Sequence, residues 1–181
     1  VVIPRKGMEY LLQAFQVVRK NHPEVHLDIV GKIVDPDYHR SLLDYVKREK
    51  MTENVRWLGP MDRAGLAAKY ASSTLLALAS LQETTPVVIA EAMAVGCPVV
   101  ATNVGGVADM VKDSVTGYVV EPMDTDGLAS AISKVLDDKL LRTGFEAEAV
   151  KIARERYAPE AVASKTADVY RRVLESHQDV Q

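Results

Sequence analysis

Two glutamates, Glu83 and Glu91, flank the segment of this sequence whose residue types best suit binding of an anion. Between them, Thr84-Thr85-Pro86 and the apolar residues that follow indicate a loop that leads into a helix. A helix N-terminus presents unpaired backbone N–H groups and a partial positive charge, which together suit a diphosphate. Carboxylates on either side can accept hydrogen bonds from hydroxyl groups at the two ends of that diphosphate. The spacing therefore predicts a site for a hydroxylated diphosphate.

The same residues also allow a purely structural interpretation. Glu83, together with Thr84 or Thr85, can cap the helix, and Glu91 can be solvated or bonded to a neighbouring loop. The residue types fit both interpretations equally, so both stay open on the sequence pattern.

A short basic segment, Arg5-Lys6-Gly7, opens the first helical stretch. A lysine or arginine at this place can supply the counter-charge for a phosphate, and Gly7 permits close approach of the chain. Solvated basic side chains at a helix start are the more ordinary interpretation.

A third motif, Asp35-Pro36-Asp37, has the spacing with which two aspartates can hold a divalent ion through oxygen ligands. It equally fits an ordinary helix start, with Asp35 before the helix and Pro36 at its first position, and we favour that interpretation. The 4 histidines show no ligand spacing. We therefore predict no metal site.

Composition excludes several other classes of function. The 181 residues include 22 Lys and Arg against 25 Asp and Glu, and this net charge of −3 provides no broad basic surface for nucleic acid or an anionic membrane. The single Cys97 excludes an internal disulfide and a multi-cysteine zinc site, and its apolar surroundings indicate a small buried side chain. The dinucleotide, P-loop, serine-hydrolase and zincin motifs are absent.

Apolar or β-branched runs alternate with amphipathic helical stretches along most of the chain. We predict six strands, at 1–3, 25–30, 54–58, 74–79, 98–102 and 117–120. We predict helices at 8–18, 38–46, 66–71, 86–95, 107–111 and 128–136, and two more helices, packed on the outside, within 142–174.

This alternation predicts an α/β fold: a three-layer, Rossmann-like parallel sheet of about six strands with helices on both faces, plus C-terminal helices. The runs LLALAS and VVAT are apolar on both faces, as expected for buried parallel strands. In such an open sheet, ligands bind beyond the carboxyl ends of the strands. The loops at 4–7, 32–37, 59–63, 80–86, 103–106 and 121–124 are therefore the places to expect function.

Several segments together resemble the C-terminal half of family-4 retaining glycosyltransferases, which have the GT-B fold. These segments are RKG, VRWLGPM, QETTPVVIAEAMAVGCPVVATNVGG and DSVTGYVVEPMD. Residues 83–106 are the most specific, because they resemble the family's Glu-seven-Glu donor motif followed by a small-residue helix and a PVVAT-type strand. The tail ARERYAPEAVASKTADVYRRVL resembles the family's last helix, which returns to the N-terminal domain. The resemblance thus implies one half of a GT-B fold, with a donor-binding domain at 1–158 and a returning helix at 159–181.

The resemblance also implies a hexosyltransferase whose substrate is a nucleotide-diphosphate sugar, without a cofactor or a metal. Lys6 corresponds to the pyrophosphate-binding lysine, Glu83 to the carboxylate near the hydroxyls of the donor sugar, and Glu91 to the one that holds the ribose. Lys6 and Glu83 are the implied catalytic residues, with Glu83 orienting the sugar. The backbone at 84–87 would cradle the phosphate, and the turn at 58–61 is similar to the segment that lies against the base. The predicted donor-binding residues are Arg5, Lys6, Leu58, Gly59, Met61, Glu83, Thr84, Thr85, Pro86, Val87 and Glu91.

The sequence departs from the family pattern where Thr84-Thr85-Pro86 replaces a common Gly-Phe-Gly, since Pro86 cannot donate an N–H to a phosphate. The family's Gly-Arg pair and its acceptor-binding domain would precede Val1. We therefore interpret the sequence as part of a longer enzyme, inactive alone, whose other domain binds a glycan, lipid or small-molecule acceptor. A nucleotide-sugar epimerase or hydrolase half-domain and a non-catalytic nucleotide-sugar-binding module are the alternatives.

Apolar residues at helical spacing in the tail predict weak self-association of the chain. They are Val162, Val169, Tyr170 and Val173. No apolar run is long enough to span a membrane, so we expect a cytoplasmic protein, with a peripheral membrane location of the full-length form as the other option.

Overall fold

The computed structural model describes residues 1–178, with side chains described as far as Ser176. The end of the predicted returning helix at 159–181 and the side chain of His177 lie outside the described residues.

Within residues 1–178, five short parallel strands form two sheets. In one sheet β1 (Leu27–Val30) pairs with β2 (Val55–Gly59). In the other, β4 (Val99–Thr102) lies between β3 (Leu76–Leu78) and β5 (Gly117–Val120), so that Val100 pairs with both Ala77 and Tyr118. The connecting elements are the 3₁₀ helix η1 (Pro4–Lys6) and the helices α1 (Met8–Asn21), α2 (Pro36–Arg48), α3 (Arg63–Ser72), α4 (Val87–Ala94), α5 (Val107–Met110), α6 (Thr125–Asp137), α7 (Lys139–Tyr157) and α8 (Pro159–Gln178).

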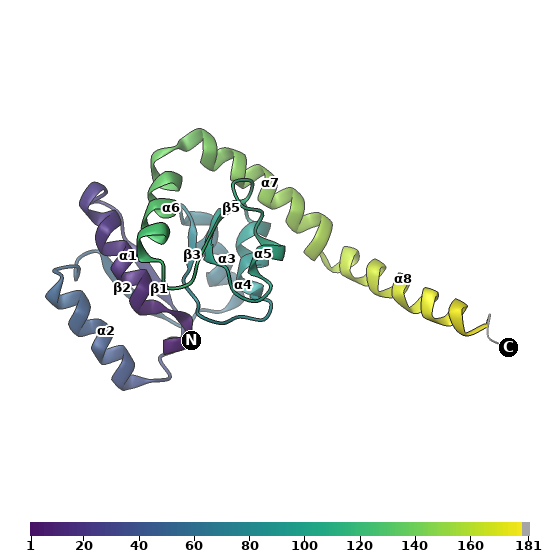
Figure 1. Cartoon of the computed structure of the whole chain (residues 1–181), viewed down its shortest axis with the longest axis horizontal. Coiled ribbons are helices and arrows are strands. Elements are labelled where there is room, and N and C mark those ends of the chain that lie inside the picture. Colours follow the sequence, from purple (N-terminus) through teal and green to yellow (C-terminus); the bar gives the residue numbers. More distant parts are fainter. Residues whose placement is uncertain (179–181) are drawn as a thin grey trace.

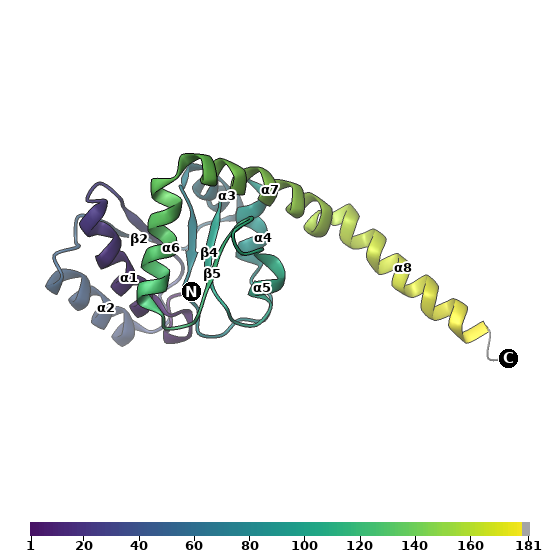
Figure 2. The same ribbon diagram turned by 45° about the horizontal axis from the view of Figure 1, so that its top comes forward.

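Helices cover both faces of the strands, as predicted (Figures 1 and 2). On one face α1 and α6 pack together against the core, and on the other lie α3, α4, α5 and α7. Parallel strands require crossovers that return over the sheet, which explains why the strands are covered on both sides.

The strand count is the main correction to the predicted fold, because the described part of the chain has five strands and not six. Residues 1–3 contribute only an isolated bridge between Val2 and Ile33. Pro4 has no backbone N–H to continue the pairing, and it begins η1 instead. The strands also divide into two sheets where a single sheet was expected.

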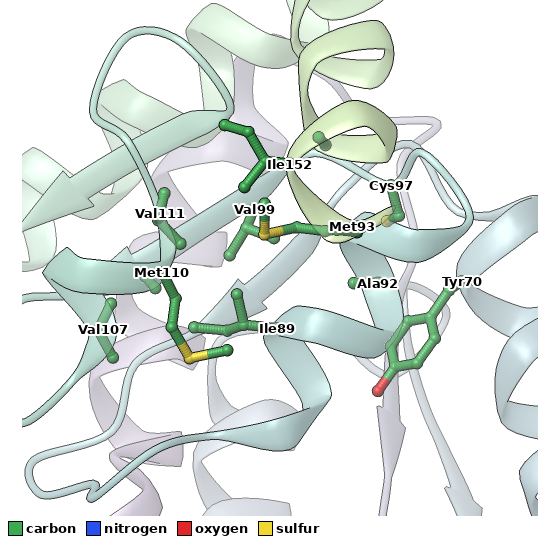
Figure 3. Close-up of a cluster of buried hydrophobic side chains, with 13 residues drawn as sticks. Tyr70, Ile89, Ala92, Met93, Cys97, Val99, Val107, Met110, Val111 and Ile152 are labelled. Carbon is green, nitrogen blue, oxygen red and sulfur yellow. The ribbon is translucent and has the colours of Figure 1, made fainter. Parts of the chain in front are cut away.

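The largest part of the core lies around β4, whose four residues are all buried, and a separate cluster lies between α1, α2, β1 and β2. Successive side chains of a strand point to opposite faces, so Val99 packs against α4 and α7 while Val100 packs against α1 and α6. Figure 3 shows the first of these clusters, in which Ile89, Met93 and Ile152 surround Val99. Cys97 is buried beside them, so the prediction of a small buried side chain is confirmed, and burial raises the pKa of its thiol to about 12.

The two tail helices are present, and they break at Ala158, close to the predicted position. α7 packs along α4, but α8 extends away from the domain (Figures 1 and 2). The expectation that both helices pack on the outside is therefore wrong for α8, whose Tyr170 and Leu174 are each 66% exposed. Among residues 1–178, no helix combines the length and the apolar character needed to cross a membrane.

Candidate functional site

Lys6 and Glu83, which are 77 residues apart in the sequence, form an ion pair at the carboxyl ends of the strands. Lys6 ends η1, and Glu83 lies in the loop between β3 and α4. The Nζ atom of Lys6 donates a hydrogen bond to Oε1 of Glu83 at 2.5 Å. The two side chains are 24% and 8% exposed, so the pair is largely shielded from water.

The Glu83 carboxylate has a second donor, which the sequence analysis did not identify. The hydroxyl of Ser80 donates to Glu83 Oε1 at 2.7 Å, and the hydroxyl of Thr102 in turn donates to the Ser80 carbonyl at 2.5 Å. Burial raises the pKa of Glu83, but hydrogen bonds from Lys6 and Ser80 and the charges of Lys6 and Arg5 outweigh it, so the pKa is held below its usual value. Glu83 is therefore ionised at neutral pH.

Two glycines bring the strand-end loops into close contact. A Cβ on Gly7, whose φ is 60°, would lie 1.8 Å from the Ala79 carbonyl oxygen, and a Cβ on Gly105, whose φ is 54°, would lie 2.0 Å from that of Glu83. Gly106 adds a backbone hydrogen bond to the Thr84 carbonyl at 2.7 Å. The turn at 105–106, whose role the sequence left open, therefore supports the loop that carries Glu83.

The N-terminus of α4 has no side-chain cap. Asp35, Asp62, Asp124 and Asp138 cap α2, α3, α6 and α7. At α4, by contrast, the N-cap residue is Pro86, which was expected inside the helix. The interpretation in which Glu83 or its threonine neighbours cap this helix is thus wrong.

Among the described residues, the backbone N–H groups of Val87 and Val88 have no hydrogen-bond partner. The first turn of α4 is consequently open to an anion. Three residues, Thr84 to Pro86, separate it from Glu83 in the chain.

Glu91 lies on the second turn of α4, 3.5 Å from the hydroxyl of Tyr70 on α3. Glu91 therefore contacts a helix, and not a neighbouring loop as the structural interpretation of the sequence expected. Burial raises the pKa of Tyr70, and the Glu91 charge adds to this effect. Glu91 and Val87 also line a cleft of about 520 Å³ between α3, α4 and the α7–α8 junction, together with Arg63.

The remaining predicted donor residues also follow strand ends, and within the described part of the chain none of their side chains hydrogen-bonds to the Glu83 carboxylate. Leu58 is exposed and Met61 is half-buried, at the end of β2 and just after it. Gly59 has a φ of 71° and open space around it. Arg5, Thr84 and Thr85 are exposed, whereas Pro86 is buried.

Asp35 accepts a hydrogen bond from the Tyr38 amide at 2.9 Å, so its predicted role at a helix start is confirmed. Its neighbour Asp37 pairs with Arg40 on the exposed surface. No group of three or more His, Cys, Asp or Glu side chains among the described residues is placed to hold a metal ion.

The model of the family described as glycosyl transferases group 1 matches residues 1–155. The chain belongs to this family. It is 34% identical over 179 residues to the phosphatidyl-myo-inositol mannosyltransferase of Mycobacterium leprae, a match that covers 98% of this chain and 46% of that protein. The chain spans less than half the length of the curated relatives that it matches.

Solved structures share the fold of this group 1 domain. The Anabaena protein Alr3699/HepE in complex with UDP matches with a TM-score of 0.86 and 27% identity, over 94% of this chain and 46% of that one. The same protein has also been solved with UDP-glucose. Sucrose-phosphate synthase from Thermosynechococcus elongatus matches with a TM-score of 0.84 and 28% identity, over 96% of this chain and 44% of that one.

Proposed function

We propose that this chain is the donor-binding domain of a retaining glycosyltransferase, which moves a sugar from a nucleotide-diphosphate sugar to an acceptor. The observation that carries the proposal is the Lys6–Glu83 pair beside the uncapped N-terminus of α4. A cation and free backbone amides suit a diphosphate, and the adjacent carboxylate suits sugar hydroxyls. The structures of HepE with UDP and UDP-glucose support this class of ligand.

In this mechanism, the protein stabilises charge that develops on the leaving diphosphate. Departure of the sugar leaves negative charge on the β-phosphate, and the Lys6 ammonium together with the amides of Val87 and Val88 would stabilise it. The ammonium has three N–H donors, so Lys6 can contact a phosphate while it keeps one bond to Glu83. These groups would supply the positive charge without a divalent ion.

Glu83 would orient the sugar, and Glu91 would hold the ribose. Among the described residues, Lys6 and Ser80 hydrogen-bond to the Glu83 carboxylate, and Arg5 acts on it through its charge. None of these residues carries a second carboxyl group. A glycosidase-type pair needs an acid across the scissile bond, so this environment favours the orienting role.

We propose that the chain is inactive by itself and that the acceptor binds to a domain outside it. The match to relatives of more than twice its length supports this arrangement. An acceptor glycan, lipid or small molecule would then meet the donor at the strand ends where Glu83 lies.

Thermal unfolding of the chain with nucleoside diphosphates and their sugar conjugates, with and without Mn²⁺, tests the donor site. A ligand at about ten times its Kd should stabilise the fold by about 1.4 kcal/mol, which corresponds to roughly 3–6 °C for a domain of this size. The shift should not require Mn²⁺ and should disappear in Lys6→Met. The matched control, Lys139→Met on the exposed start of α7, should keep it. Absence of a shift with every nucleotide would contradict the proposal.

Turnover tests the role of Glu83 in the longer enzyme. We expect Glu83→Ala to lower turnover by orders of magnitude, because the sugar would no longer be oriented toward the reacting atoms. Circular dichroism should show that the variant is folded. Transfer at nearly the wild-type rate would rule out this role.

A further inference from the structure

Only one oxygen of the Glu83 carboxylate is engaged within the described part of the protein. Oε1 accepts hydrogen bonds from both Lys6 Nζ and Ser80 Oγ, at 2.5 Å and 2.7 Å. Oε2 has no hydrogen-bond partner among the described residues. Four side-chain atoms in this part of the protein are fully buried without a hydrogen-bond partner, and Oε2 is not one of them. The second oxygen is therefore open to a ligand, although the Glu83 side chain is only 8% exposed.

Ser80 is held in place by the neighbouring strand. Ser80 and Thr102 are 0% and 3% exposed, and they follow β3 and end β4, two strands that pair in parallel. The Thr102 hydroxyl donates to the Ser80 carbonyl at 2.5 Å. The Ser80 hydroxyl has Glu83 Oε1 as its acceptor, and a buried hydroxyl is costly without one. The hydroxyl of Ser80 is thus directed at Glu83 by the packing of two strand ends.

We propose that Ser80 is a positioning residue for the donor sugar: its hydrogen bond holds Oε1 of Glu83 against the protein, so that Oε2 faces a sugar hydroxyl, and Thr102 keeps Ser80 in place. The inference rests on the proposed function, since it takes Glu83 as the carboxylate that meets the sugar. When the substrate binds, Lys6 directs some of its three N–H groups to the diphosphate and not to Glu83. Ser80 is uncharged and buried, so it stays on Oε1 and keeps the carboxylate oriented.

This role predicts a difference between two ligands that share the nucleotide. The Ser80→Ala variant removes the donor with little change in volume, and it leaves Lys6 and the amides of α4 in place. Affinity for a nucleotide-diphosphate sugar should fall about tenfold, as expected for loss of a hydrogen bond to a charged group. Affinity for the nucleoside diphosphate alone should stay within about twofold of wild type.

Isothermal titration of this chain with matched pairs of probes measures that difference. The pairs are UDP and UDP-glucose, GDP and GDP-glucose, and ADP and ADP-glucose. Thr102→Val is the second variant and should shift the sugar-nucleotide affinity in the same direction. Ser73→Ala is the control, because its hydroxyl donates to the Lys69 carbonyl at 2.7 Å at the end of α3, and it should change neither affinity.

A separate measurement reports on Glu83 directly. Carbon-13 NMR of the Glu83 carboxyl should show a higher pKa in Ser80→Ala than in wild type, because a donor to the ionised form has been removed. Ser73→Ala should leave this pKa unchanged. An unchanged pKa in Ser80→Ala would show that Ser80 does not hold the carboxylate, and would overturn the positioning role.

The outcomes separate this inference from the function on which it rests. If the wild type binds a pair and the Ser80 and Thr102 variants keep the wild-type affinity for its sugar nucleotide, the positioning role is wrong and the donor site stands. Equal losses for both members of a pair would also overturn it, since they indicate general damage to the site. Failure of the wild type to bind any probe would overturn the donor site and the positioning role together.

Discussion

Gly105 is the position where one added methyl group should displace Glu83. Its φ of 54° lies in the left-handed region, and an ideal Cβ there would be 2.0 Å from the Glu83 carbonyl oxygen. Contacts to a real Cβ are essentially never shorter than 3.0 Å. In Gly105→Ala the loop that carries Glu83 must therefore retreat by about 1 Å, a misplacement on the scale that can cost a catalytic group about 100-fold in rate.

Two other glycines allow the free-energy cost of Gly105→Ala to be divided into a conformational part and a part from steric overlap. Gly59 has a φ of 71° and no atom near its would-be Cβ, so Gly59→Ala should cost only the left-handed conformation, about 1–2 kcal/mol. Gly105→Ala has the same conformational cost and also the overlap, which should add roughly 1–3 kcal/mol. Gly144 lies inside α7 with open space around it, so Gly144→Ala should stabilise by about 0.5–1 kcal/mol.

Chemical denaturation of the chain and its three alanine variants measures these free energies of unfolding. We expect the stability order Gly144→Ala, wild type, Gly59→Ala and then Gly105→Ala. Titration with UDP and UDP-glucose, or with the pair of probes that the wild type binds, should show that Gly105→Ala loses sugar-nucleotide affinity. If Gly105→Ala is as stable as Gly59→Ala, or binds the sugar nucleotide as the wild type does, the close contact between these two loops is not what places Glu83.

Three further predictions concern acid, the nucleotide and the tail. Because the fold lowers the pKa of Glu83 from an ordinary 4.5, the stability that its charge adds should be fully present above that pH and be lost as the pH falls through the lowered value. Urea midpoints of wild type and Glu83→Gln should therefore converge on acidification; a gap that persists at the lowest pH would contradict the ion-pair origin. We expect Glu91→Gln to lower the affinity for the nucleoside diphosphate itself about tenfold, with calorimetry as the measurement and unchanged affinity as the contradicting result. The exposed side chains of α8 should drive weak self-association, so sedimentation should show less of it in Tyr170→Ser than in Leu140→Ser, a control on α7 whose side chain is even more exposed, 86% against 66%; equal association of the two variants would assign it to another surface.

Local patterns were sufficient for most of the fold. The runs around β3 and β4 are short and apolar on both faces, which favours buried parallel strands, and both strands are present, β4 fully buried. The prediction failed at residues 1–3, which have the same composition but are followed by Pro4, and at Pro86, which precedes α4. In both cases a proline at the boundary decided where the regular hydrogen bonding could begin or end.

The candidate site shows a sharper division. Residue types and spacing selected Glu83, Glu91 and Lys6, because charged groups beside a helix N-terminus have few chemical uses. They left open whether Glu83 caps α4, and the structure rejects that interpretation, because α4 has no side-chain cap and the Glu83 carboxylate pairs with Lys6 instead. Ser80 and Thr102 carried no signal in the sequence, since buried hydroxyls at strand ends are common and acquire a role only from what they contact.

The sequence by itself determined the alternation of strands and helices, and therefore which loops gather at the carboxyl edge, because hydrophobic period and turn residues act over a few neighbours. Only the tertiary structure decided that Lys6 reaches Glu83 across 77 residues, that Gly105 presses on the Glu83 backbone, and that Ser80 leaves one carboxylate oxygen free. These contacts depend on how parallel strands are ordered and how closely their loops approach. Both are set by packing of the whole core, which no local pattern records.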